Sequence, residues 1–96
     1  MNPVFEWDAR KAAANSRKHG VTFPEAITVF ADLLAKIFDD PDHSLSERRE
    51  IIIGQSSRGR LLLVSFTDRG DRIRIISART VTRRERKAHE EDIEDS

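Results

Sequence analysis

The fold is decided by residues 48–79, which read RREIIIGQSSRGRLLLVSFTDRGDRIRIISAR. Three apolar runs in this stretch are separated by short turns at residues 57–59 and 68–71, and each turn contains a glycine. This pattern predicts antiparallel strands at residues 48–56, 60–67 and 72–79. The second run is apolar on both faces, which is typical of a central strand.

Two helices are predicted before this stretch. Asp8 is suited to cap a helix over Ala9–His19, which Gly20 would end. A second helix is expected to begin at the capping box of residues 22–25 and to end at Asp32. A first strand at residues 33–38 would follow it, and residues 5–8 suit a short extended entry to the chain.

A last helix is predicted after the strands. It is expected to begin at the capping box Thr82–Glu85 and to continue to about Glu91, and the acidic residues 91–96 are expected to fray. The predicted fold is therefore α+β, with two N-terminal helices, a four-stranded antiparallel sheet and a C-terminal helix. All 96 residues, about 11.0 kDa, are expected to form one domain.

Composition narrows the function classes. The chain has no cysteine, which excludes disulfides, zinc thiolate sites and thiol nucleophiles. No apolar run approaches the ~20 residues that a membrane-spanning helix needs. The N-terminus carries no basic and apolar pattern of a secretory signal, so a cytoplasmic protein is expected.

The formal net charge of zero conceals an uneven distribution. Residues 48–87 hold twelve basic residues, eleven of them arginine, against four acids, whereas residues 90–95 hold five acids. Because arginine presents a planar fork of donors that matches phosphate, the basic segment favours a nucleic-acid partner. A solvated face of internal ion pairs is the alternative.

No common motif of metal, nucleotide or nucleophile chemistry is present. The chain has no glycine-rich phosphate loop, and its three histidines are not at metal-ligand spacing, so neither a metal nor a cofactor is expected. Histidines, carboxylates and arginines would nevertheless suffice to cleave RNA through its own 2′-hydroxyl, which needs a base, an acid and cations. The residues alone predict RNA binding and leave nuclease activity open.

A series of different short segments extends along nearly the whole chain. In order, they are FEWD (5–8), KHGV (18–21), DHS (42–44), ER (47–48), GRLL (59–62), FT (66–67) with Arg69, IRIISAR (73–79) and ER (85–86). This pattern resembles the BrnT-type toxins of bacterial type II toxin–antitoxin pairs. The resemblance implies a RelE-like fold and an endoribonuclease that halts translation. It also implies neutralisation in a hetero-oligomer with an antitoxin that has a ribbon–helix–helix DNA-binding part.

The site residues follow from the arginine-rich segment and this resemblance together. The predicted catalytic residues are His19, Glu47, Arg60, Arg79 and His89, with both arginines on the phosphorane and a histidine transferring the proton. The family usually has tyrosine where this chain has His89. Predicted RNA contacts, on an arginine-rich sheet face, are Lys18, Arg48, Arg58, Arg72, Arg74 and Arg83.

Two polar residues have simpler expected roles than catalysis. Glu85 is assigned to helix capping alone, and His43 to a loop. A non-catalytic RNA- or DNA-binding module on the same basic face is the alternative function. A protein that only binds a partner through its acidic and basic segments is the third.

Overall fold

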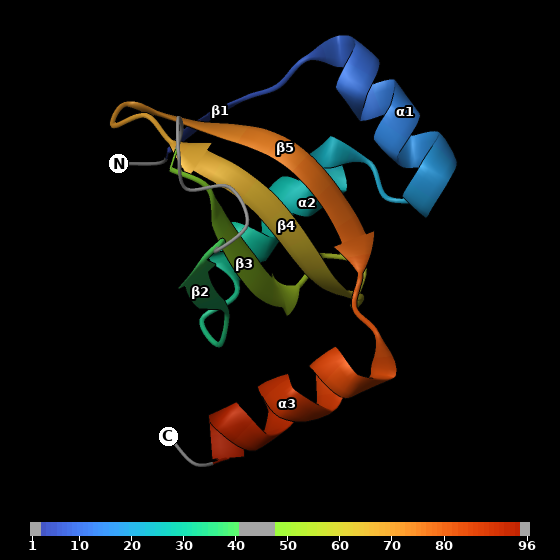
Figure 1. Cartoon of the computed structure of the whole chain (residues 1–96), viewed down its shortest axis with the longest axis vertical. Helices are drawn as coiled ribbons and strands as arrows, with labels where there is room; N and C mark the ends of the chain where they lie inside the picture. Colours follow the sequence, from blue (N-terminus) through green and yellow to red (C-terminus); the bar gives the residue numbers. More distant parts are fainter. Residues whose placement is uncertain (1–2, 41–47, 95–96) are drawn as a thin grey trace.

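The computed structural model describes residues 3–40 and 48–94 of the chain (Figure 1). In these residues, one sheet has the strand order β1-β5-β4-β3-β2. The elements, in chain order, are β1 (Val4–Glu6), α1 (Ala9–His19), α2 (Phe23–Ile27), the 3₁₀ helix η1 (Thr28–Ala31), β2 (Lys36–Asp39), β3 (Glu50–Gln55), β4 (Leu61–Asp68), β5 (Arg72–Thr80) and α3 (Arg83–Glu94).

The sheet confirms the α+β class but is mixed, so the prediction of four antiparallel strands was wrong in detail. Strands β2 to β5 pair antiparallel, as expected. The fifth strand, β1, pairs parallel with β5, and Val4 lies opposite Arg72. A strand of three residues is too short to show a period of two, and its partner lies 68 residues further along the chain.

Helix α1 has the predicted ends. The side chain of Asp8 accepts a hydrogen bond from the backbone N–H of Lys11 at 3.0 Å. Gly20 has a φ of 68° and donates its N–H to the Ser16 carbonyl at 2.9 Å. A left-handed φ favours glycine, so the helix ends here.

The next two predicted elements are shorter than expected. The predicted helix to Asp32 divides into the five-residue α2 and η1. The predicted strand at residues 33–38 begins only at Lys36, because the Asp32 carboxylate accepts the N–H of Leu34 at 3.0 Å and forms a turn. Helix α3, in contrast, continues to Glu94, beyond its predicted end at about Glu91.

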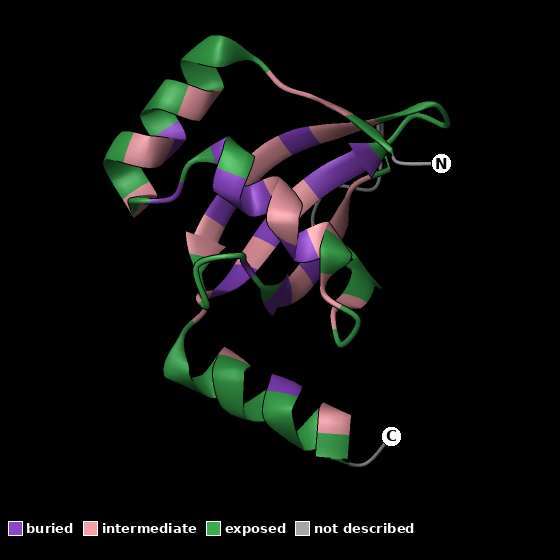
Figure 2. Cartoon of the chain, turned by 180° about the vertical axis from the view of Figure 1, so that it is seen from behind, coloured by how far each residue is buried: buried purple, intermediate pink, exposed green. Residues whose placement is uncertain are grey.

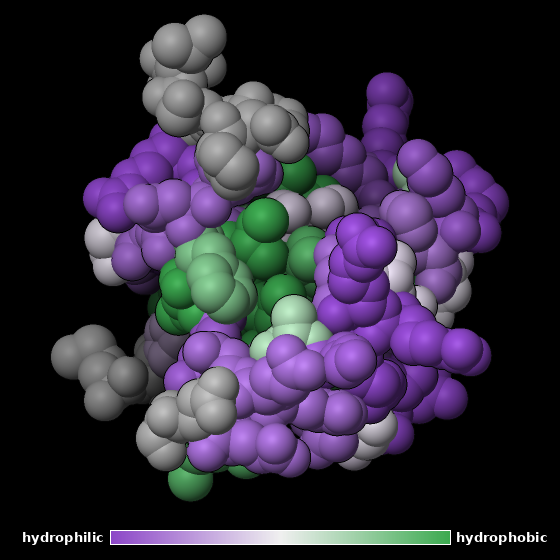
Figure 3. Space-filling view, turned by 60° about the horizontal axis from the view of Figure 1, so that its bottom comes forward, coloured by the Kyte–Doolittle hydropathy of each residue, from purple (hydrophilic) through white to green (hydrophobic). Residues whose placement is uncertain are grey.

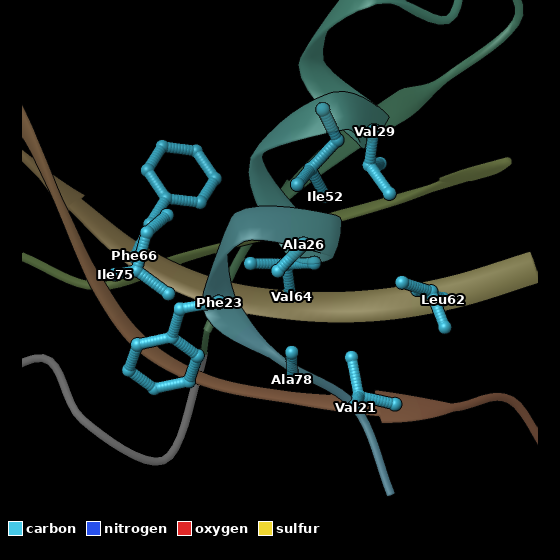
Figure 4. Packing of buried hydrophobic residues seen from close by; sticks show 10 residues of the cluster. All are labelled: Val21, Phe23, Ala26, Val29, Ile52, Leu62, Val64, Phe66, Ile75 and Ala78. Carbon is cyan, nitrogen blue, oxygen red and sulfur yellow. The ribbon is translucent and has the colours of Figure 1, made fainter. Parts of the chain in front are cut away.

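The core lies between α2 and one face of the sheet (Figures 2 and 4). Phe23 and Ala26 of α2 are fully buried against Leu62 and Val64 of β4. Trp7 packs edge-on against Phe23, with ring centroids 5.9 Å apart. The other buried members of this cluster are Val21, Val29, Ile52, Phe66, Ile75 and Ala78.

Because β5 contains a bulge, Ile75 and Ala78 both face the core although they are three residues apart in the sequence. Ser65 pairs with Ser77 whereas Phe66 pairs with Ile75, so Ile76 is the extra residue. Ala78 therefore reaches the core, where the buried side chain of Asn15 binds its backbone. The Asn15 amide accepts from the Ala78 N–H at 3.0 Å and donates to the Ala78 carbonyl at 2.8 Å, which ties α1 to β5.

Candidate functional site

The fold brings basic residues of α1, β5, α3 and the turn between β3 and β4 to one end of the sheet. Strand β4 begins where β5 ends, and the N–H of Val81 donates to the Leu61 carbonyl at 3.2 Å. The C-terminus of α1 reaches the same end, because Arg60 donates to the Gly20 carbonyl at 3.0 Å. We call this region the basic end; it comprises Lys18, His19, Arg58, Arg60, Arg79 and Arg83.

The other predicted RNA contacts lie at the opposite end of the sheet. Arg72 and Arg74 are at the start of β5, and Arg48 precedes β3. Arg74 contacts the Glu6 carboxylate at 2.9 Å, and Arg48 contacts Asp39 at 3.3 Å. The predicted single arginine-rich face is thus divided into two separate groups.

Arg60 is bound to a buried carboxylate. Its Nε donates to Glu25 Oε2 at 2.9 Å, and its Nη2 donates to Oε1. The Ser56 hydroxyl also donates to Glu25 Oε2, at 2.7 Å, and the Glu25 side chain is only 5% exposed. The hydrogen bonds from Arg60 and Ser56 hold the pKa of the Glu25 carboxyl below its ordinary value, although burial acts in the opposite direction. This pair fastens α2 to the β3–β4 hairpin.

Arg79 is held by Glu85 in a two-pronged ion pair. Its Nη1 and Nη2 donate to Glu85 Oε1 and Oε2 at 2.8 and 2.9 Å. The predicted capping box is also formed, since the N–H of Thr82 donates to Glu85 Oε1 at 2.8 Å and the Thr82 hydroxyl accepts from the Glu85 N–H at 3.1 Å. The hydrogen bonds from Arg79, more than the cap, lower the pKa of Glu85 to about 2. Glu85 stays ionised at neutral pH.

The pairing leaves one edge of the Arg79 guanidinium available. Nη1 also donates to the Thr80 carbonyl at 3.2 Å, so both of its hydrogens are used. Within residues 3–40 and 48–94, Nε and the second Nη2 hydrogen have no protein acceptor. These two N–H groups are parallel along one edge of a planar group and match two oxygens of a phosphate. Glu85 therefore orients this free edge.

The two described histidines lie in different surroundings. His19 is half-buried in the last turn of α1, at the basic end. His89 is buried on α3, where it lines a cavity together with Glu85. Its Nδ1 atom has no hydrogen-bond partner in the described part of the chain. The remaining predictions, Glu47 and His43, lie outside the described residues.

Two further observations concern residues 3–40 and 48–94 alone. No group of three or more histidine, aspartate or glutamate side chains in them is arranged to hold a metal ion. No helix among them is long and apolar enough to cross a membrane.

The comparisons with known proteins agree with the motif pattern. Residues 7–85 match the family described as the ribonuclease toxin, BrnT, of type II toxin-antitoxin systems. The chain belongs to the BrnT family. A BrnT protein of this kind has an antitoxin partner. No curated protein matched the chain.

A solved BrnT structure has a similar fold. The crystal structure of the Brucella abortus ribonuclease toxin BrnT, at 1.1 Å resolution, is 25% identical in sequence, with a TM-score of 0.65. The match covers 85% of this chain and 100% of that one. Membership of the BrnT family is therefore confirmed, whereas the RelE-like relationship stays a prediction.

Two acidic residues were missed as site components. Glu25 and Glu85 each occupy the last position of a capping box. That local role already accounts for a glutamate at each position, so the capping pattern gives no reason to assign them to the site. Their bonds to Arg60 and Arg79 span 35 and 6 residues, and no local pattern indicates the first. The short spacing from Arg79 to Glu85, around a strand-to-helix turn, was the available signal for the second.

Proposed function

We propose that this BrnT family member is a metal-independent endoribonuclease that inhibits translation by cleaving RNA at the basic end. The observation that supports this most is the free guanidinium edge of Arg79, which Glu85 orients. Such a preorganised pair of donors would bind two phosphate oxygens and stabilise the charge that develops on them. Action on cellular RNA would place the protein in the cytoplasm.

The proposed reaction uses the RNA's own 2′-hydroxyl as nucleophile. A base removes the 2′-proton, the oxygen attacks phosphorus, and the bond to the 5′-oxygen breaks as that oxygen takes up a proton. The products are a 2′,3′-cyclic phosphate and a free 5′-hydroxyl. We assign a proton transfer to His19, which shares the basic end with Arg79, and keep His89 and Glu47 as the further candidates.

Cleavage is expected to persist without divalent metal. Purified protein should cut a single-stranded RNA equally fast in EDTA and in magnesium, and the fragments should carry a cyclic phosphate. Loss of cleavage in EDTA that magnesium restores would contradict the mechanism. RNA binding without any cleavage in either buffer would favour the non-catalytic module instead. His19→Asn should slow cleavage more than His89→Asn does.

RNA affinity is expected to depend on salt through the basic end. Each phosphate contact on a single strand contributes a slope of ~−0.7 in log K against log salt. Arg58→Gln and Arg83→Gln should each make the slope shallower by about that amount. Arg72→Gln, at the opposite end, is the matched control and should leave it unchanged. An equal effect of Arg72→Gln would mean that RNA binds along both ends of the sheet.

For the partner, we propose an antitoxin with a ribbon–helix–helix DNA-binding part, joined to the toxin in a hetero-oligomer. The support is the family resemblance. A complex of the two purified proteins that binds operator DNA, where the toxin alone does not, is the expected result.

A further inference from the structure

An apolar groove lies between α3 and the face of the sheet that is opposite to α2 (Figure 3). The first part of this groove has a volume of about 330 Å³ and runs between α3 and the strands β2 and β3, where Phe38 and Ile53 form its apolar wall. A second part, of about 170 Å³, is lined by Leu34, Leu61 and Ile93 among others. The two parts lie next to each other, because His89 lines both.

Two exposed large apolar side chains of the described residues line the groove, Leu34 (57% exposed) and Phe38 (48%). Both lie within residues 33–38, which also hold the exposed Leu33 and Ile37, but Ile37 pairs with the core residue Ile52 and so faces the other side of the sheet. Strand β2 is at the end of the sheet, and no other strand of residues 3–40 and 48–94 pairs with its outer backbone edge. An apolar patch of this kind next to a hollow is typical of a site for a protein partner.

The charge beside the groove is acidic. The second half of α3 carries Glu90, Glu91, Asp92 and Glu94. Glu90 and Asp92 line the groove, and their ion pairs are long and exposed, with Arg86 at 3.9 Å from Glu90 and Lys36 at 3.8 Å from Asp92. An apolar and acidic surface repels phosphates, so RNA is not the ligand here.

We propose that the cognate antitoxin binds this groove with an apolar segment that is flanked by lysine or arginine. Its apolar side chains would cover Leu34 and Phe38, and its basic side chains would approach Glu90 and Asp92, which line the groove. The family supplies the partner, because a type II toxin is bound by an antitoxin. The proposal does not depend on the cleavage mechanism. It places the antitoxin beside the proposed RNA site, because Glu85 and His89 line the groove.

A second copy of this chain fits the groove less well. In a two-fold dimer the same patch meets itself, so the acidic half of α3 would lie near its own equivalent. Like charges that face each other weaken such an interface. A partner with basic residues beside its apolar segment is complementary to the groove.

The test measures antitoxin binding by variants that leave the fold intact. Phe38→Glu and Leu34→Glu place a charge on exposed groove positions. Val4→Glu is the matched control, because Val4 is 55% exposed but lies on β1, at the other edge of the sheet. With the purified cognate antitoxin, calorimetry should show at least ~30-fold weaker binding for Phe38→Glu and an unchanged Kd for Val4→Glu.

A charge-reversal variant tests the second half of the proposal. Glu90→Lys with Asp92→Lys should weaken antitoxin binding and reduce its salt dependence. A wild-type Kd for both Phe38→Glu and Leu34→Glu, in variants with an unchanged melting temperature, would overturn the proposal. So would a dimer of the toxin alone that Phe38→Glu dissociates. Because no RNA is present, neither result depends on whether the protein is a ribonuclease.

Discussion

Replacement of Arg79 by alanine is expected to lower the rate of RNA cleavage by about 10²–10³-fold, the usual effect of removing one donor to transition-state charge. Arg79→Lys keeps the charge but has no second N–H along a planar edge, so it should bind RNA normally and still turn over slowly. The measurements are single-turnover cleavage rates and RNA affinity. Arg79→Ala should also abolish toxicity in growing cells and leave antitoxin binding unchanged.

Glu85→Gln tests whether the orientation of Arg79 matters. The amide keeps an acceptor for the Thr82 N–H but no longer pairs with both Nη groups of Arg79. We expect kcat to fall while KM changes little, because the positive charge at the site remains. If Arg79→Ala stays toxic with unchanged cleavage, Arg79 is a structural residue. If Arg79→Ala fails to fold, the ion pair between Arg79 and Glu85 stabilises the fold.

Replacement of Glu25 by alanine is expected to cost about 2–4 kcal/mol of unfolding free energy, because the buried Ser56 hydroxyl and the partly exposed Arg60 guanidinium lose their acceptor. Arg60 and Ser56 both lose hydrogen bonds to its carboxylate. Small domains have only about 5–15 kcal/mol of stability, so the loss is large. Urea unfolding followed by circular dichroism measures it.

Glu6→Ala is the matched control. Its ion pair with Arg74 has a similar length of 2.9 Å, but the two side chains are 27% and 31% exposed. Solvated pairs contribute only about 0–1 kcal/mol, so this variant should unfold nearly as the wild type does. Equal losses in both variants would show that burial of the Glu25 carboxylate is not decisive.

The stability that Glu25 supplies should depend on pH. Its pKa is lower in the folded protein than the ordinary value of 4.5, so its contribution is fully present above that pH. It is lost as the pH falls below 4.5 towards the folded pKa. The wild type should therefore lose more stability than Glu25→Ala does between pH 6 and pH 3.

The pairing of Arg60 also bears on its predicted catalytic role. Its Nε and Nη2 groups are both engaged with Glu25, whereas Arg79 keeps a free edge. If Arg60→Lys lowers stability and cleavage in parallel, Arg60 holds the hairpin in place. If it lowers cleavage alone, Arg60 contacts RNA as the sequence predicted.

The sequence by itself determined the local structure of this protein. Helix α1 begins after Asp8 and ends at Gly20 as predicted, and α3 begins at the capping box of Thr82 and Glu85. These signals could be recognised because they act over three or four residues. The antiparallel strands β3 to β5 follow from short turns between apolar runs. The motif pattern, which covers nearly the whole chain, also identified the family.

Only the tertiary structure decided which charges meet. The parallel partner of β1, the Glu25–Arg60 pair and the grouping of Arg60 with Arg79 all join residues that are distant in the sequence. Whether an arginine is free or paired depends on such distant neighbours, and neither composition nor periodicity contains them. For the same reason, one arginine-rich sheet face was predicted, whereas strand pairing in the folded chain places the basic residues at two opposite ends of the sheet.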